Sequence, residues 1–174
     1  MSNFNSLEAR VAVLEAGVLE HSTTEASVPV LEGVDNGLYS QLGFVAHRLG
    51  YRVEDSDDIT KEILKDGRRG LNKRFFSGPT IMIKQGAPLQ MAATIAHEIG
   101  HHFTPPINDT YGQIFAEVVA EGTAFIVCDH QGLDISPQAF PYIAGYRKDG
   151  LTTGMKDDIL AASTTILGHL HEID

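Results

Sequence analysis

Residues 112–128, GQIFAEVVAEGTAFIVC, constrain the fold of this chain most, because they combine near-continuous apolar character with two acidic residues. We expect a helix here, with little of its circumference left for solvent. Glu117 and Glu121 lie four residues apart and therefore share a helix face. Their charges repel, and burial adds a desolvation cost, unless a divalent cation lies nearby. The alternative is that this face is exposed and both glutamates stand in water.

The preceding apolar segment carries side chains that complement these acids. Residues 88–103, PLQMAATIAHEIGHHF, predict a helix that starts at its proline and ends before a Thr-Pro-Pro stretch. His97 and His101 are four apart, so they can offer two imidazole nitrogens to one metal ion. Glu98 lies one position round the helix, where it can reach a metal-bound water. This combination is the H-E-x-x-H pattern of zinc hydrolases, with Glu98 as the general base.

Together the two segments predict a site for one Zn²⁺ per chain. His97 and His101 are two expected ligands, and Glu121 is the preferred third. Glu117 would then hold a ligand histidine in its metal-binding tautomer. The roles of the two glutamates can be exchanged, and the sequence leaves both assignments open.

The rest of the chain predicts a mixture of helices and short strands. A helix is expected from Asn36, as its N-cap, to about residue 48, with Gly50 as its C-terminal stop. Further helices are expected at 56–65, 136–150 and 155–170, and strands at 51–54, 71–76 and 80–84. The last two strands flank Ser-Gly-Pro, which predicts that they pair.

The first residues, 1–22, predict an N-terminal helix that precedes the main domain, residues 23–174. Its apolar residues alternate spacings of four and three, which gives a heptad seam over about two heptads. These residues are Leu7, Val11, Leu14 and Val18. The seam can form a short coiled coil, and thus a homo-oligomer through residues 5–20, or it can dock on the domain.

Charge and composition limit the expected partners. The formal net charge of −10 disfavours a broad phosphate-binding surface, so a nucleic-acid partner is not expected. No uninterrupted apolar run approaches the ~20 residues of a membrane span, and the N-terminus lacks a signal-peptide pattern. The single cysteine, Cys128, excludes an internal disulfide and suits a reducing compartment. We therefore expect a cytoplasmic protein without a membrane partner.

Two stretches resemble known families of metallopeptidases. TIMIK (80–84) followed by ATIAHEIGHH (93–102) resembles the strand-to-helix entry of the ImmA/IrrE metallopeptidases, gluzincin-like enzymes linked to repressor cleavage. The downstream run is similar to the peptidase half of ArdC-type antirestriction and phage polyvalent proteins. The matching residues are Glu117, Val119, Ala120, Glu121, Ala124, Cys128, Gly132-Leu133-Asp134 and Tyr142-Ile143. The resemblance spans roughly residues 70–170.

This resemblance implies a compact α+β domain of the zincin type. A small sheet would pack on the active-site helix, further helices would complete the domain, and a helical extension would precede it. The residues and the resemblance together imply a zinc metallopeptidase that hydrolyses a peptide bond of a protein substrate through a metal-activated water. The strand at 80–84 would offer its edge to an extended substrate.

Attack of the water on the peptide carbonyl would form a tetrahedral oxyanion, which the zinc and one further hydrogen-bond donor would stabilise. Tyr142 and Tyr146 are the candidates for this donor, although each also fits a packed aromatic residue. The alternative function is a non-catalytic metal-binding or interaction protein of phage or mobile-element origin, with an antirestriction or regulatory role. Structural zinc favours four protein ligands, often thiolates, and this chain has one cysteine. The retained glutamate base and the lack of thiolates favour catalysis.

Overall fold

The computed structural model describes residues 2–22, 27–56, 58, 69–75 and 78–173. Within these residues the helices are α1 (Ser2–His21), α2 (Leu38–Arg48), α4 (Pro88–Gly100), α5 (Thr110–His130), α6 (Ser136–Tyr146) and α7 (Thr153–His171). A short 3-10 helix, η1 (His101–Phe103), follows α4 directly. The strands are β1 (Arg52–Glu54), β2 (Gly70–Phe75) and β3 (Gly78–Ile83). The chain thus adopts the expected α+β class, and the helix expected at 56–65 lies outside the described residues except for residues 56 and 58.

The three strands form one mixed sheet in the order β1-β3-β2. β2 pairs antiparallel with β3, as the sequence predicts, and β1 pairs parallel with β3. Residues 80–83 of β3 are buried, which accounts for the apolar run Ile81-Met82-Ile83 that follows Thr80. The prediction that the strand at 80–84 offers an edge to substrate is wrong, because β3 is hydrogen-bonded on both sides. Among the described strands, the outer edges belong to β1 and β2.

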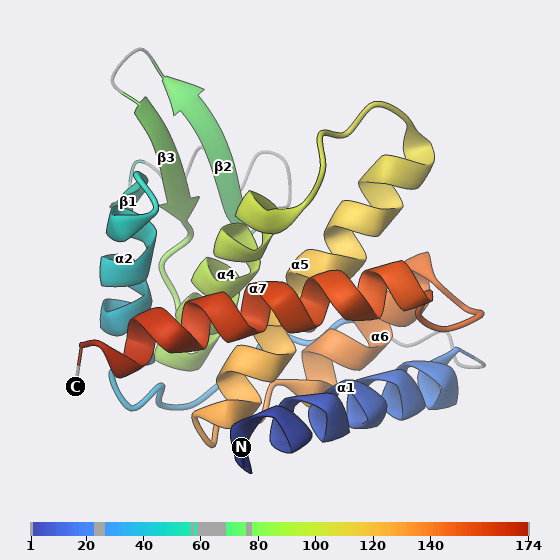
Figure 1. Ribbon diagram of the computed structural model, residues 1–174. Helices are drawn as coiled ribbons and strands as arrows, with labels where there is room; N and C mark the ends of the chain where they lie inside the picture. The colour runs from blue at the N-terminus through green and yellow to red at the C-terminus, as the bar shows by residue number, and fades with distance from the viewer. Residues whose placement is uncertain (1, 23–26, 57, 59–68, 76–77, 174) are drawn as a thin grey trace.

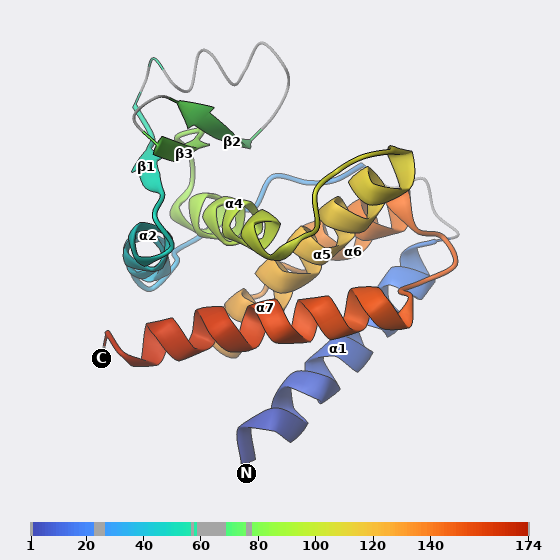
Figure 2. The same ribbon diagram turned by 45° about the horizontal axis from the view of Figure 1, so that its top comes forward.

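Helix α4 lies between the sheet and the other long helices (Figure 1, Figure 2). It contacts β2 and β3 on one side, α2 on another and α5 most extensively. Its small residues, Ala92, Ala93, Ala96 and Gly100, are all buried and let neighbouring elements approach closely. Because α4 is enclosed in this way, a polar side chain on it needs a partner on a neighbouring element.

The closest approach of α4 to α5 is at Gly100. A Cβ atom on Gly100 would lie 2.8 Å from Cα and 3.0 Å from the carbonyl oxygen of Ala120. We expect Gly100→Ala to lower the free energy of unfolding by about 1–3 kcal/mol, because the backbone of α5 would have to move. Urea unfolding at a fixed zinc concentration measures the change.

Gly43→Ala on α2 is the matched control for this prediction. A Cβ atom there meets open space, so we expect it to raise the free energy of unfolding by about 0.5–1 kcal/mol. Equal stability of the two variants would contradict the close approach of α4 and α5.

The N-terminal helix α1 packs against the rest of the chain. It contacts α6, α5 and α7, and its heptad seam is buried in the common hydrophobic core. The seam residues Leu7, Val11, Leu14 and Val18 have exposures of 5%, 7%, 0% and 0%. Of the two expectations for this seam, docking on the domain is therefore the one that the structure shows. A coiled coil through residues 5–20 would require α1 to leave this position, and homo-oligomerisation stays a prediction.

The start of α2 differs from the expectation. Asn36 adopts a left-handed conformation with φ of 53°, and the N-cap position is Gly37. The side chain that caps the helix is Asp35, whose carboxylate accepts hydrogen bonds from the backbone N–H groups of Gly37 and Tyr39 at 3.2 and 2.8 Å. The predicted Asn36 cap is wrong, because the neighbouring acid takes that role. The expected stop at Gly50 is confirmed, since its φ is 89° and its N–H donates to the carbonyl of His47.

Helix α5 is the one described helix that is long and apolar enough to cross a membrane by length and composition alone. Its 18-residue window has a mean hydropathy of 1.2, and 67% of that window is buried inside the protein. The central helix of a soluble protein has the same properties. The burial of α5 therefore fits a soluble protein, and the cytoplasmic location stays a prediction.

Candidate metal centre

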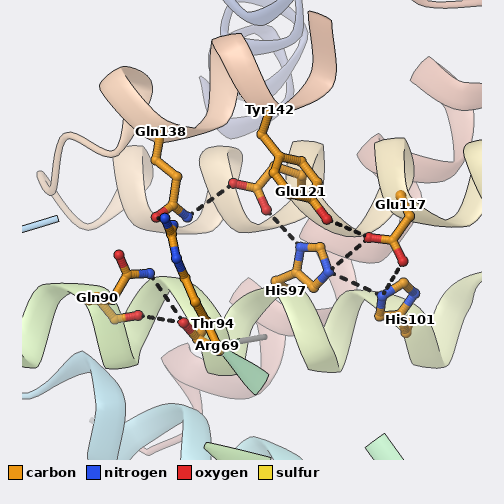
Figure 3. Close-up of polar contacts among 9 residues, drawn as sticks. All are labelled: Arg69, Gln90, Thr94, His97, His101, Glu117, Glu121, Gln138 and Tyr142. Atoms are coloured by element: carbon orange, nitrogen blue, oxygen red, sulfur yellow. Dashed lines mark hydrogen bonds and ion pairs between the residues drawn. The ribbon is translucent and has the colours of Figure 1, made fainter. Parts of the chain in front are cut away.

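Three side chains of metal-ligating type converge where α4 meets α5. His97 and His101 extend from the end of α4 and the start of η1, and Glu117 faces them from α5 (Figure 3). Their ligand atoms all lie within 4.8 Å of one another. The spacing of four brings the two imidazoles onto one face of α4, as the sequence predicts.

The distances within this group suit a tetrahedral ion. Zinc with ligands at about 2.0–2.1 Å separates its ligand atoms by about 3.3 Å. Nε2 of His97 lies 3.1 Å from Nε2 of His101 and 3.4 Å from Oε2 of Glu117, and His101 Nε2 lies 3.7 Å from Oε1 of Glu117. Two imidazoles and a carboxylate are also a donor set that zinc accepts in catalytic sites. The residues present therefore fit a zinc ion.

Glu121 contacts the same histidine from its other side. Its Oε2 lies 2.7 Å from Nδ1 of His97, and its Oε1 accepts a hydrogen bond from Gln138 at 3.3 Å. The side chain of Glu121 is only 3% exposed, whereas that of Glu117 is 20% exposed. The geometry thus favours the exchanged assignment, with Glu117 as the third ligand and Glu121 holding His97. The preferred assignment of Glu121 as the ligand does not match this arrangement.

The two candidate tyrosines pack side by side near the centre. Tyr142 on α6 donates its hydroxyl to Oε2 of Glu117 at 2.8 Å, and its ring lies edge-on to His97. Burial and the charge of Glu117 raise the pKa of Tyr142, so the hydroxyl keeps its proton. Tyr146 packs its ring on Tyr142. Tyr142 therefore orients Glu117 in this structure, and a role for either tyrosine as the oxyanion donor stays a prediction.

Burial and neighbouring charges set the proton positions in the group. Burial lowers the pKa of His97, but hydrogen bonds to Glu117 and Glu121 outweigh it and hold that pKa well above its usual value. Burial and the charge of His97 lower the pKa of His101 to about 4. Burial raises the pKa of Glu117, but contacts with His97 lower it to about 2. These shifts favour a proton on His97, and a cation held at Nε2 would have to replace the proton there.

Glu98 lies outside the group of ligand atoms, as expected from its position round the helix. It is 7% exposed and faces the start of β2, where Gly70 leaves space for it. A Cβ atom on Gly70 would lie 2.8 Å from Oε1 of Glu98 and 2.6 Å from Cγ2 of Thr94. Glu98 follows His97 directly in α4, so its carboxylate starts from the backbone next to a candidate ligand. A residue with a side chain at position 70 would displace this carboxylate.

Two residues of the surroundings were not expected from the sequence. Gln138 on α6 hydrogen-bonds Glu121, and Arg69 donates to the side-chain oxygen of Gln138. They are 69 residues apart in the chain, and neither belongs to a pattern that marks a metal site. The signal that could have found Gln138 is a polar residue on a largely apolar helix next to the tyrosines. Nothing in the sequence around Arg69 distinguishes it from the other cations nearby.

Comparisons of the chain with protein-family models, curated proteins and solved structures find no match. The resemblance to ImmA/IrrE and ArdC-type metallopeptidases therefore stays a prediction.

Proposed function

We propose that this protein is a zinc-dependent metallopeptidase, with His97, His101 and Glu117 as the ligands and Glu98 as the general base. One observation carries the proposal: Nε2 of His97 and Nε2 of His101 lie 3.1 Å apart, and they lie 3.4 and 3.7 Å from Oε2 and Oε1 of the Glu117 carboxylate, respectively. The carboxylate of Glu98, on the same helix, is buried. Three protein ligands are typical of catalytic zinc, whereas structural zinc takes four.

His97, His101 and Glu117 would hold the zinc ion, which would supply Lewis-acid chemistry by lowering the pKa of a water towards about 7 and polarising a carbonyl. The chain itself contributes Glu98, which takes a proton from the attacking water and passes it to the leaving amine. Glu121 keeps Nε2 of His97 directed at the centre by accepting a hydrogen bond from the N–H at Nδ1. Tyr142 fixes the rotamer of Glu117 through its hydroxyl.

An extended peptide has a suitable place at the edge of β2. This strand starts at Gly70, against Glu98, and is paired on its other edge with β3. Strand addition there would lay the substrate backbone alongside the base. The substrate edge that the sequence placed at 80–84 thus moves to the neighbouring strand.

The partial exposure of the ligands also supports catalysis. The side chains of His97, His101 and Glu117 are 13%, 19% and 20% exposed, so each ligand side chain is partly accessible to solvent. A catalytic zinc needs an open side, whereas a structural zinc is enclosed by its ligands. The alternative, a non-catalytic metal-binding or interaction protein of phage or mobile-element origin, has no specific contact in its favour.

The test is hydrolysis of a complex peptide mixture by the zinc-loaded protein, with new termini identified by mass spectrometry. We expect cleavage by wild type and by His47→Ala, which changes an exposed histidine on α2. We expect none from His101→Ala, which lacks a ligand. Zinc retained at about one ion per chain with an untouched peptide mixture would overturn the peptidase proposal and leave the metal centre standing.

A further inference from the structure

A line of polar contacts, fully buried in its middle and half-buried at its ends, leads from the residue before β2 to the candidate metal centre. Nη1 of Arg69 donates to Oε1 of Gln138, and Nε2 of Gln138 donates to Oε1 of Glu121. Oε2 of Glu121 in turn accepts from Nδ1 of His97 (Figure 3). Gln138 and Glu121 are 5% and 3% exposed. We call these four residues, Arg69, Gln138, Glu121 and His97, the buried relay.

The chemistry of the groups gives the buried relay one direction. A guanidinium has donors and no acceptor, so Arg69 must face the carbonyl oxygen of the Gln138 amide. The NH₂ group of Gln138 therefore points at Glu121, whose carboxylate only accepts. The other oxygen of Glu121 then requires a proton on Nδ1 of His97. This leaves Nε2 as the nitrogen of His97 that is free to bind a metal.

We propose that Arg69 and Gln138 are positioning residues for the metal ligand His97, which they hold in the Nδ1-protonated form through Glu121. The inference rests on the proposed metal centre and extends it by two residues that touch neither the ligand atoms nor a substrate. Without Gln138, the buried Oε1 of Glu121 loses its hydrogen-bond donor, and the carboxylate can rotate away from Nδ1 of His97. Without Arg69, the Gln138 amide can turn over and present its oxygen to a carboxylate.

Arg69 is itself held in place. Its Nη2 donates to the backbone carbonyls of Val28 and Pro29 at 3.3 and 3.1 Å, so the guanidinium bridges two segments of the chain. The next residue, Gly70, lies against Glu98. The start of β2 is therefore connected to both the ligand histidine and the base.

Zinc affinity, measured by competition with a chromophoric chelator, tests the inference without a substrate. The variants are Gln138→Met, which removes the donor to Glu121, and Arg69→Met, which removes the donor to Gln138. The matched control is Gln90→Met. Gln90 is a buried glutamine on α4 that binds the N–H of Leu31 and the hydroxyl of Thr94, but no residue of the relay.

We expect both relay variants to bind zinc about tenfold more weakly, towards the low end of the ~10–100-fold range for residues behind a ligand. Gln90→Met should keep the zinc affinity of wild type, even if its unfolding midpoint falls as much as those of the two relay variants. The visible spectrum of the Co²⁺-loaded protein should shift in the relay variants alone, because it reports the ligand geometry.

Zinc affinities and Co²⁺ spectra in both relay variants equal to those of Gln90→Met would overturn the positioning role and leave the proposed function intact. Thermal unfolding without metal shows that a variant has folded, and Arg69→Met, at the half-buried end, decides the matter where Gln138→Met does not fold. A wild type that holds no zinc would overturn the positioning role and the proposed metal centre together.

Discussion

Glu117→Ala should release the metal, and Glu121→Ala should retain it more weakly. After dialysis against zinc-free buffer, we expect about one zinc per chain in wild type and almost none in Glu117→Ala, which leaves two histidines as ligands. In Glu121→Ala the three ligands remain, but Nδ1 of His97 loses its acceptor. Its zinc affinity should fall by about 10–100-fold. Metal content by mass spectrometry and chelator competition measure both effects.

The control for this pair is Glu172→Ala, which removes an exposed glutamate that pairs with Arg48 on the surface. It should bind zinc as wild type does, because it lies outside the centre. The converse pattern, with the zinc lost from Glu121→Ala and kept by Glu117→Ala, would restore the assignment preferred from the sequence. Equal retention by both variants would remove α5 from the ligand set altogether.

The reason why the sequence leaves the two glutamates open lies in the contact between α4 and α5. Glu117 and Glu121 share one face of α5, so spacing alone makes them equivalent. The choice between them depends on where α5 crosses α4 along its length. The backbone of Ala120 lies against Gly100, which brings Glu121 to the Nδ1 side of His97 and Glu117 to the Nε2 side. This register is a property of tertiary packing, which helix periodicity does not reveal.

Local sequence patterns predicted most of the helices and strands, but they did not predict contacts between segments that are distant in the sequence. Pro88 predicted the start of α4, the spacing of four predicted that His97 and His101 share a face, and the Ser-Gly-Pro stretch predicted the pairing of β2 with β3. The parallel pairing of β1 depends on a distant segment, so the position of β3 in the centre of the sheet was not predictable. Asp35 and Asn36 are equally good caps by residue type, and only the backbone conformation decides between them.

Arg69 and Gln138 show the same limit for the site. Gln138 reaches Glu121 because α6 packs on α5, and no local pattern in the sequence reveals this packing. Sequence patterns find ligands because ligands follow one another along a helix. They do not find residues that act through a ligand from another element.

Glu98→Gln should abolish hydrolysis and leave the metal in place. The amide is nearly isosteric with the buried carboxylate and fits the space beside Gly70, so we expect an unchanged fold and about one zinc per chain. It cannot accept the proton of the attacking water, so kcat should fall by about 10²–10⁴-fold. Product formation on a peptide from the cleavage mixture, with zinc content measured on the same sample, checks both parts.

Two further variants separate the base from its surroundings. Thr94→Val changes a neighbour of Glu98 on α4 that also lies against Gly70, and it should keep most of the activity, because it removes no proton acceptor. Gly70→Ala should lower kcat while the zinc stays bound, since its Cβ atom would push into Oε1 of Glu98. Full activity in Glu98→Gln would assign the proton transfer to another group and remove Glu98 from the mechanism. Loss of zinc from Glu98→Gln would instead make this carboxylate part of the metal-binding set, and its burial against β2 would then be a property of the metal-free protein.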